Sequence, residues 1–478
     1  MPFEVLLTIL VLAVGFYMAW NIGANDVANA MGTSVGSGAL TLAKAVFIAG
    51  ILEFCGAYFL GSNVSETMQR GIVDPNLFAD DPKIFLFGML AALLATAIWL
   101  QIASFFGWPV STTHAIVGAI LGFGALVAGF HTVQWGVVGN IALSWVISPV
   151  LSGIIAYLIF SLIQRNVLYA MKPFQAARRL IPYILFLTFF IFTVSSLSDG
   201  IKNLNLHFNF LTTIYIASAA GLLAFFIGLF LLQKKKLPEG HAEIPHLRYA
   251  NQATSLAKAA KHLTRVKLGS SGETREELDE LHKRVRAMRK ALTAKSETRS
   301  HSSEYTSVEK MFAYLQIISA CFVAFAHGSN DVANAIGPVA AILEVVRSGT
   351  VAISGQIPSW LLAFGGFGIV VGLATWGWRV IETIGRKITE LTPTRGFSAE
   401  FGAASTILVA SKLGLPVSTT HCIVGAVLGV GLARGISALN LRMLRDIVLS
   451  WIITLPASAF ACIILFYIIK ALFTPLFN

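Results

Sequence analysis

Long apolar segments alternate with polar connections along most of this chain. Seven such runs precede a charged segment that begins near residue 234, and five follow it, some of them short or interrupted. A helix needs about 20 apolar residues to cross a bilayer. The runs lie at 3–20, 41–61, 84–104, 112–130, 135–163, 182–199, 209–233, 311–327, 359–380, 399–412, 417–433 and 447–470. This pattern predicts an all-α polytopic membrane protein with about 12 membrane segments.

Composition supports the same class. Apolar residues make up 56% of the chain and charged residues 12%, about half the charged share of a soluble globular protein. The net charge of +11 does not indicate nucleic-acid binding, because residues 234–308 carry 16 basic and 9 acidic side chains and so supply +7 of it.

The charges of the connecting segments predict an orientation. Residues 62–83 are acidic, with four carboxylates and two bases, whereas residues 164–181 carry four bases and no acid. Basic loops favour the cytoplasmic side. We therefore expect a multi-pass protein of the plasma or inner membrane, with both termini outside and the basic loop 234–308 in the cytoplasm.

The loop 234–308 differs from the rest of the chain. Residues 276–292 place Leu278, Leu281, Val285 and other apolar residues at spacings of three and four, which predicts a helix. A solvated linker with one helix is the favoured interpretation, and a regulatory or partner-binding role is the alternative.

Two polar motifs each occur twice. Residues 23–32 read GANDVANAMG and residues 328–337 read GSNDVANAIG, with eight of ten positions identical. Residues 109–122 and 416–429 both begin PVSTTH and agree at twelve of fourteen positions. The offsets of 305 and 307 residues show that both motifs belong to one duplicated unit.

The number of segments between the copies predicts an inverted repeat. Seven segments precede the second copy, so that copy enters the membrane in the opposite direction, and such repeats place a substrate site near the midplane at their interface. If 84–104 and 112–130 are re-entrant half-helices, the parity is unchanged. The predicted parts are a first repeat (1–163), connecting segments (164–233), the cytoplasmic loop (234–308) and a second, inverted repeat (309–478).

The PVSTTH motifs predict broken helices. Proline interrupts a helix that runs into it, and serine and threonine favour the first helical positions. A fresh helix N-terminus carries free N–H donors and about half a positive charge, which suits an anion such as phosphate or sulfate. Simple capping of the helices is the alternative. The candidate anion ligands are Ser111, Thr112, Thr113, Ser418, Thr419 and Thr420.

The NDVAN motifs place carboxylates and amides among small residues, where backbones can pack closely or unwind. A carboxylate at membrane depth needs compensation, and two aspartates beside an anion would repel it unless each holds a cation. Na⁺ suits these oxygens, protonation is the other option, and capping of a helix break is the structural alternative. The candidate cation ligands are Asn25, Asp26, Asn29, Asn330, Asp331 and Asn334, with Na⁺ expected at Asp26 and Asp331.

Four more residues are candidates for coupling or support. Glu53 and Glu400 lie in apolar runs but not at equivalent positions of the repeat, so a role with the coupling ion and an interhelical hydrogen bond remain equally open. His114 and His421 follow the hydroxyl triplets. Each histidine could donate to the anion or carry a proton, but bracing of the half-helix is slightly favoured.

No nucleotide-binding loop and no catalytic dyad is recognisable in the sequence, so we expect a transporter driven by an ion gradient, not an enzyme, and no cofactor. The paired GANDVANA/GSNDVANA and PVSTTH motifs, with GTSVGSGALTL at 32–42, resemble the inorganic phosphate transporter (PiT) family. The resemblance covers roughly residues 1–165 and 310–475. It implies a dimeric symporter of phosphate with Na⁺ or H⁺, with functional acids at Asp26, Asp331, Glu53 and Glu400.

These observations give a mechanistic hypothesis. Cations neutralise Asp26 and Asp331, phosphate docks between the two helix N-termini, and the site is then exposed to the other side. A sulfate or other oxyanion permease on the same scaffold is the main alternative. A phosphate-sensing receptor or a channel is less favoured, because duplicated broken helices are typical of transporters.

Overall fold

The structure, a computed structural model, describes residues 3–108, 110–198, 200–201, 204, 206–234, 246–297, 303–351, 357–378, 381, 391–435 and 441–476. Within these ranges the chain is helical, and its only extended pairing is two isolated β-bridges, Val73–Val133 and Ile201–Leu206. The all-α prediction is therefore confirmed for the described residues.

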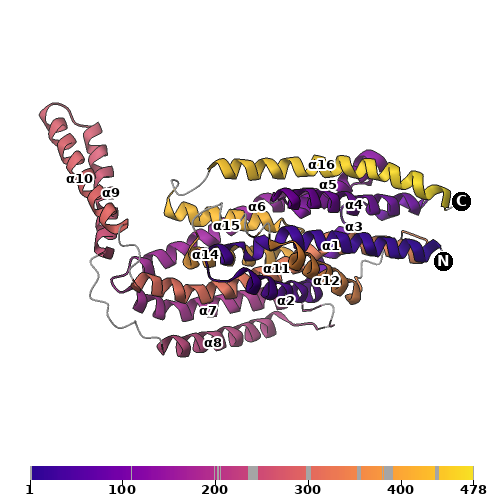
Figure 1. Cartoon of the computed structure of the whole chain (residues 1–478), viewed down its shortest axis with the longest axis horizontal. Helices are drawn as coiled ribbons and strands as arrows, with labels where there is room; N and C mark the ends of the chain where they lie inside the picture. The colour runs from indigo at the N-terminus through magenta and orange to yellow at the C-terminus, as the bar shows by residue number, and fades with distance from the viewer. Residues whose placement is uncertain are drawn as a thin grey trace. The chain divides into compact units, whose positions relative to one another are not determined.

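The helices follow one another along the chain as Figure 1 shows. The α-helices of the first half are α1 (Phe3–Gly36), α2 (Leu42–Leu60), α3 (Ser62–Arg70), α4 (Pro82–Phe106), α5 (Thr112–Gly122), α6 (Trp135–Ile163), α7 (Pro173–Leu197) and α8 (Phe210–Gln233). Those of the second half are α9 (His246–Leu268), α10 (Glu273–Glu297), α11 (Ser303–Ser348), α12 (Ser359–Thr375), α14 (Pro393–Lys412), α15 (Thr419–Arg434) and α16 (Leu441–Phe473). Short 3₁₀ or π segments are η1 (Pro75–Phe78), η2 (Phe123–Ala128), η3 (Phe130–Thr132), η4 (Gln164–Leu168) and η7 (Thr474–Leu476).

Eight of the described helices are long and apolar enough to cross a membrane, namely α1, α2, α4, α6 with η4, α7, α8, α11 and α16, and three shorter apolar helices accompany them. Their surfaces reverse the pattern of a soluble protein. Phe47 and Phe460 are 70% and 67% exposed, whereas Asp26, Glu53 and Glu400 are buried. Apolar residues outside and charged residues inside are what a lipid environment demands, so the chain is a multi-pass membrane protein. A count of twelve segments remains a prediction.

The chain forms two compact units. The first comprises residues 1–160, 185–224 and 312–478 and contains every candidate site residue. In it α1 packs against α12 and α4, α16 against α4 and α5, and α14 against α15. Glycines allow two of its helix crossings. A Cβ atom at Gly23 would collide with the carbonyl oxygen of Ile369, and one at Gly328 with that of Glu53. Such close approach of helix backbones is typical of membrane proteins.

The second unit comprises residues 161–184 and 225–311. Its helices α9 and α10 form a hairpin that turns at Gly272, whose φ of +63° favours glycine. The helix predicted over 276–292 is confirmed as part of α10. Asp279 hydrogen-bonds to Lys267 across the hairpin and lies 3.3 Å from Lys283. These two ammonium groups hold the pKa of the Asp279 carboxyl below its usual value, and Lys267 has the larger effect.

Candidate functional site

Two helices begin in the interior, at the predicted PVSTTH motifs. Helix α5 starts at Thr112 and α15 at Thr419, and the N-cap hydroxyls of Ser111 and Ser418 accept hydrogen bonds from the N–H groups of His114 and His421 at 3.2 and 3.3 Å. The two serines therefore cap the helices, as the sequence allowed. Each hydroxyl keeps its own proton available for donation.

The two helix starts meet. The Thr113 hydroxyl donates to the carbonyl oxygen of Val417 at 3.0 Å, and the Thr420 hydroxyl donates to that of Val110 at 3.4 Å. Each threonine thus bonds to the segment that precedes the other helix. Pro109, which begins the first motif, lies outside the described residues. The neighbouring residues Ser111, Thr112, Ser418 and Thr419 are all buried.

Helices α1 and α11 run past this junction without a break. Both NDVAN motifs lie inside continuous helices, so close packing and not unwinding is what their small residues permit. The alternative that the Asp–Asn cluster caps a helix break is wrong. The polar side chains project from intact helices toward the two hairpins, α4–α5 and α14–α15.

The asparagine amides bind the hairpins in matched pairs. Asn25 Nδ2 donates to Ser104 Oγ at 3.0 Å, as Asn330 Nδ2 donates to Ser411 Oγ at 3.0 Å. In the same way, Asn29 Nδ2 donates to Thr420 Oγ1 at 2.8 Å and Asn334 Nδ2 to Thr113 Oγ1 at 3.3 Å. Each duplicated helix therefore contacts its own hairpin through its first asparagine and the hairpin tip of the other copy through its second.

The aspartates accept hydrogen bonds from the middle threonine of each triplet. Thr112 donates to Asp26, and Thr419 Oγ1 donates to Asp331 Oδ2 at 3.0 Å. Among the described residues, several buried oxygens near them receive no hydrogen bond, namely Asn25 Oδ1, Asn330 Oδ1, Asn334 Oδ1 and Asp331 Oδ1. A buried acceptor without a partner is costly. Carboxylate and amide oxygens without donors suit a hard cation, so these residues fit the predicted ion sites.

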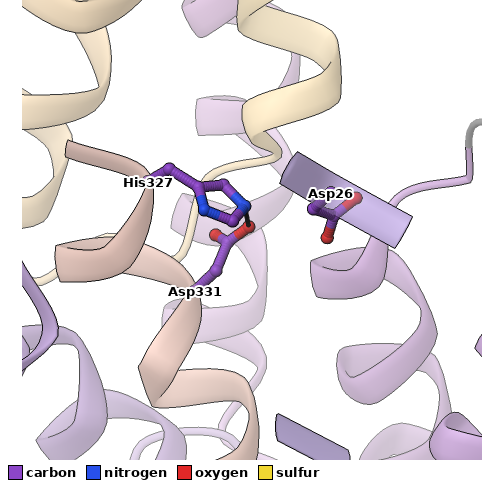
Figure 2. Close-up of side chains that lie close together, drawn as sticks. All are labelled: Asp26, His327 and Asp331. Carbon is purple, nitrogen blue, oxygen red and sulfur yellow. Dashed lines mark ion pairs between the residues drawn. The ribbon is translucent and has the colours of Figure 1, made fainter. Parts of the chain in front are cut away.

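His327 stands beside this cluster and was not among the predicted residues. Its Nε2 atom lies 3.0 Å from Asp331 Oδ2 (Figure 2). Its Nδ1 atom lies 3.2 Å from Glu53 Oε1, and all three side chains are buried. Ligand atoms of Asp26, His327 and Asp331 lie within 4.8 Å of one another. The sequence held a signal, because position 327 corresponds to Ile22 at the repeat offset, and a histidine replaces an aliphatic residue there.

The two buried glutamates have different surroundings. Glu53 contacts His327 and so joins the Asp331 side of the cluster. Glu400 is instead held by four donors from α1 and α11. They are Thr33 Oγ1 at 2.6 Å, Ser34 Oγ at 2.7 Å, Gln316 Nε2 at 3.1 Å and Ser319 Oγ at 2.5 Å. The absence of repeat symmetry between Glu53 and Glu400, noted in the sequence, agrees with these different partners.

His114 and His421 form a stack with two tryptophans. Their ring centroids are 4.4 Å apart, His114 lies 3.9 Å from the Trp145 ring, and His421 lies 3.5 Å from the Trp451 ring. Their Nδ1 atoms lie 3.4 and 3.5 Å from the carbonyl oxygens of Trp451 and Trp145, respectively. These contacts tie α5 to α16 and α15 to α6, which favours the bracing interpretation.

The fold and the site together define a class. The described part of the chain has eight membrane-length helices and an interior site with two helix N-termini, six hydroxyls, and carboxylate and amide oxygens that lack donors. Helix N-termini attract anions, and unpartnered oxygens attract cations. Such a site inside a duplicated membrane bundle is typical of a polytopic transport protein.

Comparison with known proteins places the chain in this class. Residues 22–462 match the phosphate transporter family, and the chain belongs to that family. It is 44% identical over 468 residues to the chloroplastic inorganic phosphate transporter 2-1 of Arabidopsis thaliana, covering 96% of this chain and 71% of the relative. A solved structure of a sodium-dependent phosphate transporter is 36% identical, with a TM-score of 0.79, and the match covers 97% of this chain and 99% of that one. The resemblance predicted from the motifs is confirmed, and phosphate is the substrate of the family.

Proposed function

We propose that this chain carries inorganic phosphate across the membrane by symport with cations. Na⁺ is the favoured coupling ion and H⁺ is the alternative. One observation carries the proposal. Asn334 and Asp331 each have a buried oxygen without a donor, and their side chains hydrogen-bond to Thr113 and Thr419 at the starts of α5 and α15. An anion site alone would not place carboxylates there, because they would repel the anion. The similarity to a solved sodium-dependent phosphate transporter supports sodium as the coupling ion.

The cations would bind on α1 and α11. Asn25 on α1, and Asp331, Asn330 and Asn334 on α11, supply oxygens that receive no hydrogen bond from a described donor, and Asp26 on α1 adds a buried carboxylate. Asn29 Nδ2 donates to Asp26 Oδ1 at 3.3 Å and so orients the first carboxylate. Neutralising both aspartates removes the repulsion that would otherwise exclude phosphate.

Phosphate would bind between the starts of α5 and α15. Ser111 and Ser418 cap the helices through their lone pairs, so each O–H remains free to donate to a phosphate oxygen. Thr113 and Thr420 currently donate to backbone carbonyls of the opposite segment and could exchange that bond for one to phosphate. The charge of two helix N-termini adds to these hydrogen bonds.

Thr112 and Thr419 would couple the two ligands. Each hydroxyl donates to the aspartate of its own half and has only one proton to donate. When a cation binds the carboxylate, the aspartate no longer depends on that proton, and the hydroxyl becomes available to phosphate. Cation binding thus prepares the anion site by two routes, charge neutralisation and release of two donors.

Transport would proceed by alternating access around this site. His114 and His421 would brace the half-helices, Glu400 would support α14 against α1 and α11, and Glu53 would act on Asp331 through His327. In the proposed orientation both termini lie outside and residues 234–308 lie in the cytoplasm. The membrane part would consist of two repeats, and a homodimer is the assembly that the family resemblance implies.

Uptake of radiolabelled phosphate into proteoliposomes tests the proposal. Three conditions are compared: an inward Na⁺ gradient, an inward H⁺ gradient, and no gradient. Saturable uptake that requires Na⁺ is expected. Uptake that requires only H⁺ would assign the coupling to protons, and transport of sulfate in place of phosphate would contradict the proposed substrate.

A further inference from the structure

A cavity of about 660 Å³ opens beside the tip of the α14–α15 hairpin. Its lining includes Asn63, Glu66, Thr67 and Arg70 from α3, with Gln134 and Lys412. The cavity ends at Leu413 and Gly414, and Gly414 lies four residues before the proposed phosphate ligand Ser418. Its volume falls in the range of small-molecule sites. None of the described site residues on α1 or α11 lines it.

Arg70 gives this cavity an available positive charge. Its side chain is exposed, and within the described part of the chain no carboxylate forms an ion pair with it. It occupies the last turn of α3, where the helix terminus favours a cation. Gln134 Nε2 donates to the Arg70 carbonyl oxygen at 3.0 Å, and both residues also line a neighbouring cavity of about 200 Å³. Arg70 therefore lines both cavities.

The other charged residues leave this region favourable to an anion. Lys412 Nζ donates to the carbonyl oxygens of Ser198 and Gly200 at 2.6 and 3.1 Å, which fixes its ammonium at the wall. Asp74 in the smaller cavity accepts hydrogen bonds from the backbone and side-chain nitrogens of Asn76 at 3.0 and 3.1 Å, so it is turned into its own helical cap. The larger cavity thus has two bases, Arg70 and Lys412, and one acid, Glu66.

The cavity leads toward the phosphate site. Thr67 Oγ1 donates to the Gly414 carbonyl oxygen at 2.7 Å and so joins α3 to the segment before α15. A third cavity of about 470 Å³ shares Leu413 with the first and reaches Val417, the residue next to Ser418. Residues of the segment 412–417, which precedes the N-cap of α15, line one or both of these cavities.

We propose that the cavity around Arg70 is a capture site that attracts inorganic phosphate before it reaches the helix N-termini, and that Arg70 is its contact residue. This inference rests on the proposed function. A guanidinium matches the geometry of a phosphate oxygen pair. Long-range attraction by one exposed charge raises the local anion concentration and is weakened by salt.

Uptake kinetics of Arg70→Gln, Arg70→Lys and the control Lys83→Gln test the site. Lys83 lies at the end of the acidic segment 62–83, which also contains Arg70, but it lines none of the three cavities. At low ionic strength, Arg70→Gln should raise the half-saturating phosphate concentration about tenfold with an unchanged maximal rate. The increase should shrink at high ionic strength, Arg70→Lys should lie between Arg70→Gln and the wild type, and Lys83→Gln should match the wild type.

If the wild type transports phosphate but Arg70→Gln leaves the half-saturating concentration unchanged, or lowers only the maximal rate, the capture site is wrong. Absence of uptake in the wild type would instead overturn the proposed function.

Thiol labelling gives a second readout. Asn63→Cys in intact cells should react faster with an impermeant anionic reagent than Asn63→Cys/Arg70→Gln does, and phosphate should slow the reaction. The wild type, whose four cysteines are half-buried or buried, supplies the background. Equal rates in the two variants, or reaction only from the cytoplasmic side, would contradict an entrance lined by Arg70.

Discussion

Thr112 and Thr419 are the residues through which the two ligands of this protein would communicate. Each hydroxyl lies at the first position of a helix that would face the anion, yet each donates to an aspartate that we propose binds the cation. A threonine has one proton, so it cannot donate to both ligands at once. This competition gives a physical reason for ordered binding, with the cation first.

Removing one of these hydroxyls should affect both ligands. In Thr112→Val we expect the half-saturating concentrations of Na⁺ and of phosphate each to rise at least about fivefold, the lower end of ordinary coupling energies. Thr112→Ser should retain most of the coupling. Uptake kinetics at varied Na⁺ and phosphate measure it, with Thr96→Val as control, because Thr96 donates only within α4, to the Ala92 carbonyl. A change in one ligand alone would contradict the shared role.

His327 should stabilise the fold as well as the site. Replacing it by isoleucine, the residue at the equivalent position 22, leaves the Glu53 carboxylate buried without its partner. Breaking a buried charged pair costs about 3–5 kcal/mol. Chemical unfolding in detergent should show this loss for His327→Ile, and Glu53→Gln/His327→Ile should recover part of it. If the single variant unfolds like the wild type, the pair does not contribute to stability.

The site residues could be predicted to the extent that they repeat. Asp26 and Asp331, with the paired asparagines and hydroxyls, recur in the sequence, and the structure brings them together. His327 was missed because it breaks the repeat, and the Glu400 partners Gln316 and Ser319 were missed because they have no polar counterpart in the first half. Asymmetric contacts depend on which helices pack together, and local sequence does not encode that.

At the scale of helices, apolar runs predicted membrane segments better than they predicted helix ends. The run at 135–163 coincides with α6, and 41–61 is within a residue of α2. In contrast, 3–20 and 311–327 mark only parts of α1 and α11, which continue to Gly36 and Ser348. Polar NDVAN residues end an apolar run, but they do not end a helix whose side chains find hydrogen bonds on neighbouring helices.

Glycine contacts between helices should limit substitution more than helix propensity does. A Cβ atom at Gly56 would collide with the Phe325 carbonyl oxygen of α11, whereas one at Gly139 in α6 would meet no atom within 4 Å. Gly56→Ala should therefore lower the free energy of unfolding by about 1–3 kcal/mol. Gly139→Ala should leave it unchanged or raise it by up to about 1 kcal/mol. Thermal unfolding in one detergent compares the two, and equal stability would show that α2 can shift without cost.

At the scale of the whole molecule, paired hydrogen bonds link the two halves of the sequence. Asn29 of the first half contacts Thr420 of the second, and Asn334 of the second contacts Thr113 of the first. The proposed ligand site is thus shared between residues 391 and 221 positions apart in the sequence. The inverted orientation of the halves and the count of twelve segments stay predictions, because an assignment of membrane sides needs labelling from both faces.

A shared site makes ligand binding a property of the entire membrane bundle, and its signature is a cation-dependent stabilisation by phosphate. Two unneutralised aspartates oppose an anion, so phosphate in choline buffer should change the unfolding temperature little. With Na⁺ present, phosphate at about 100 times its dissociation constant should add about 2.7 kcal/mol to the free energy of unfolding. In Asp26→Asn/Asp331→Asn the repulsion is absent, so phosphate should stabilise the protein equally with and without Na⁺. Equal stabilisation of the wild type in choline and in Na⁺ would separate the anion site from the aspartates, and coupling would then have to arise elsewhere in the bundle.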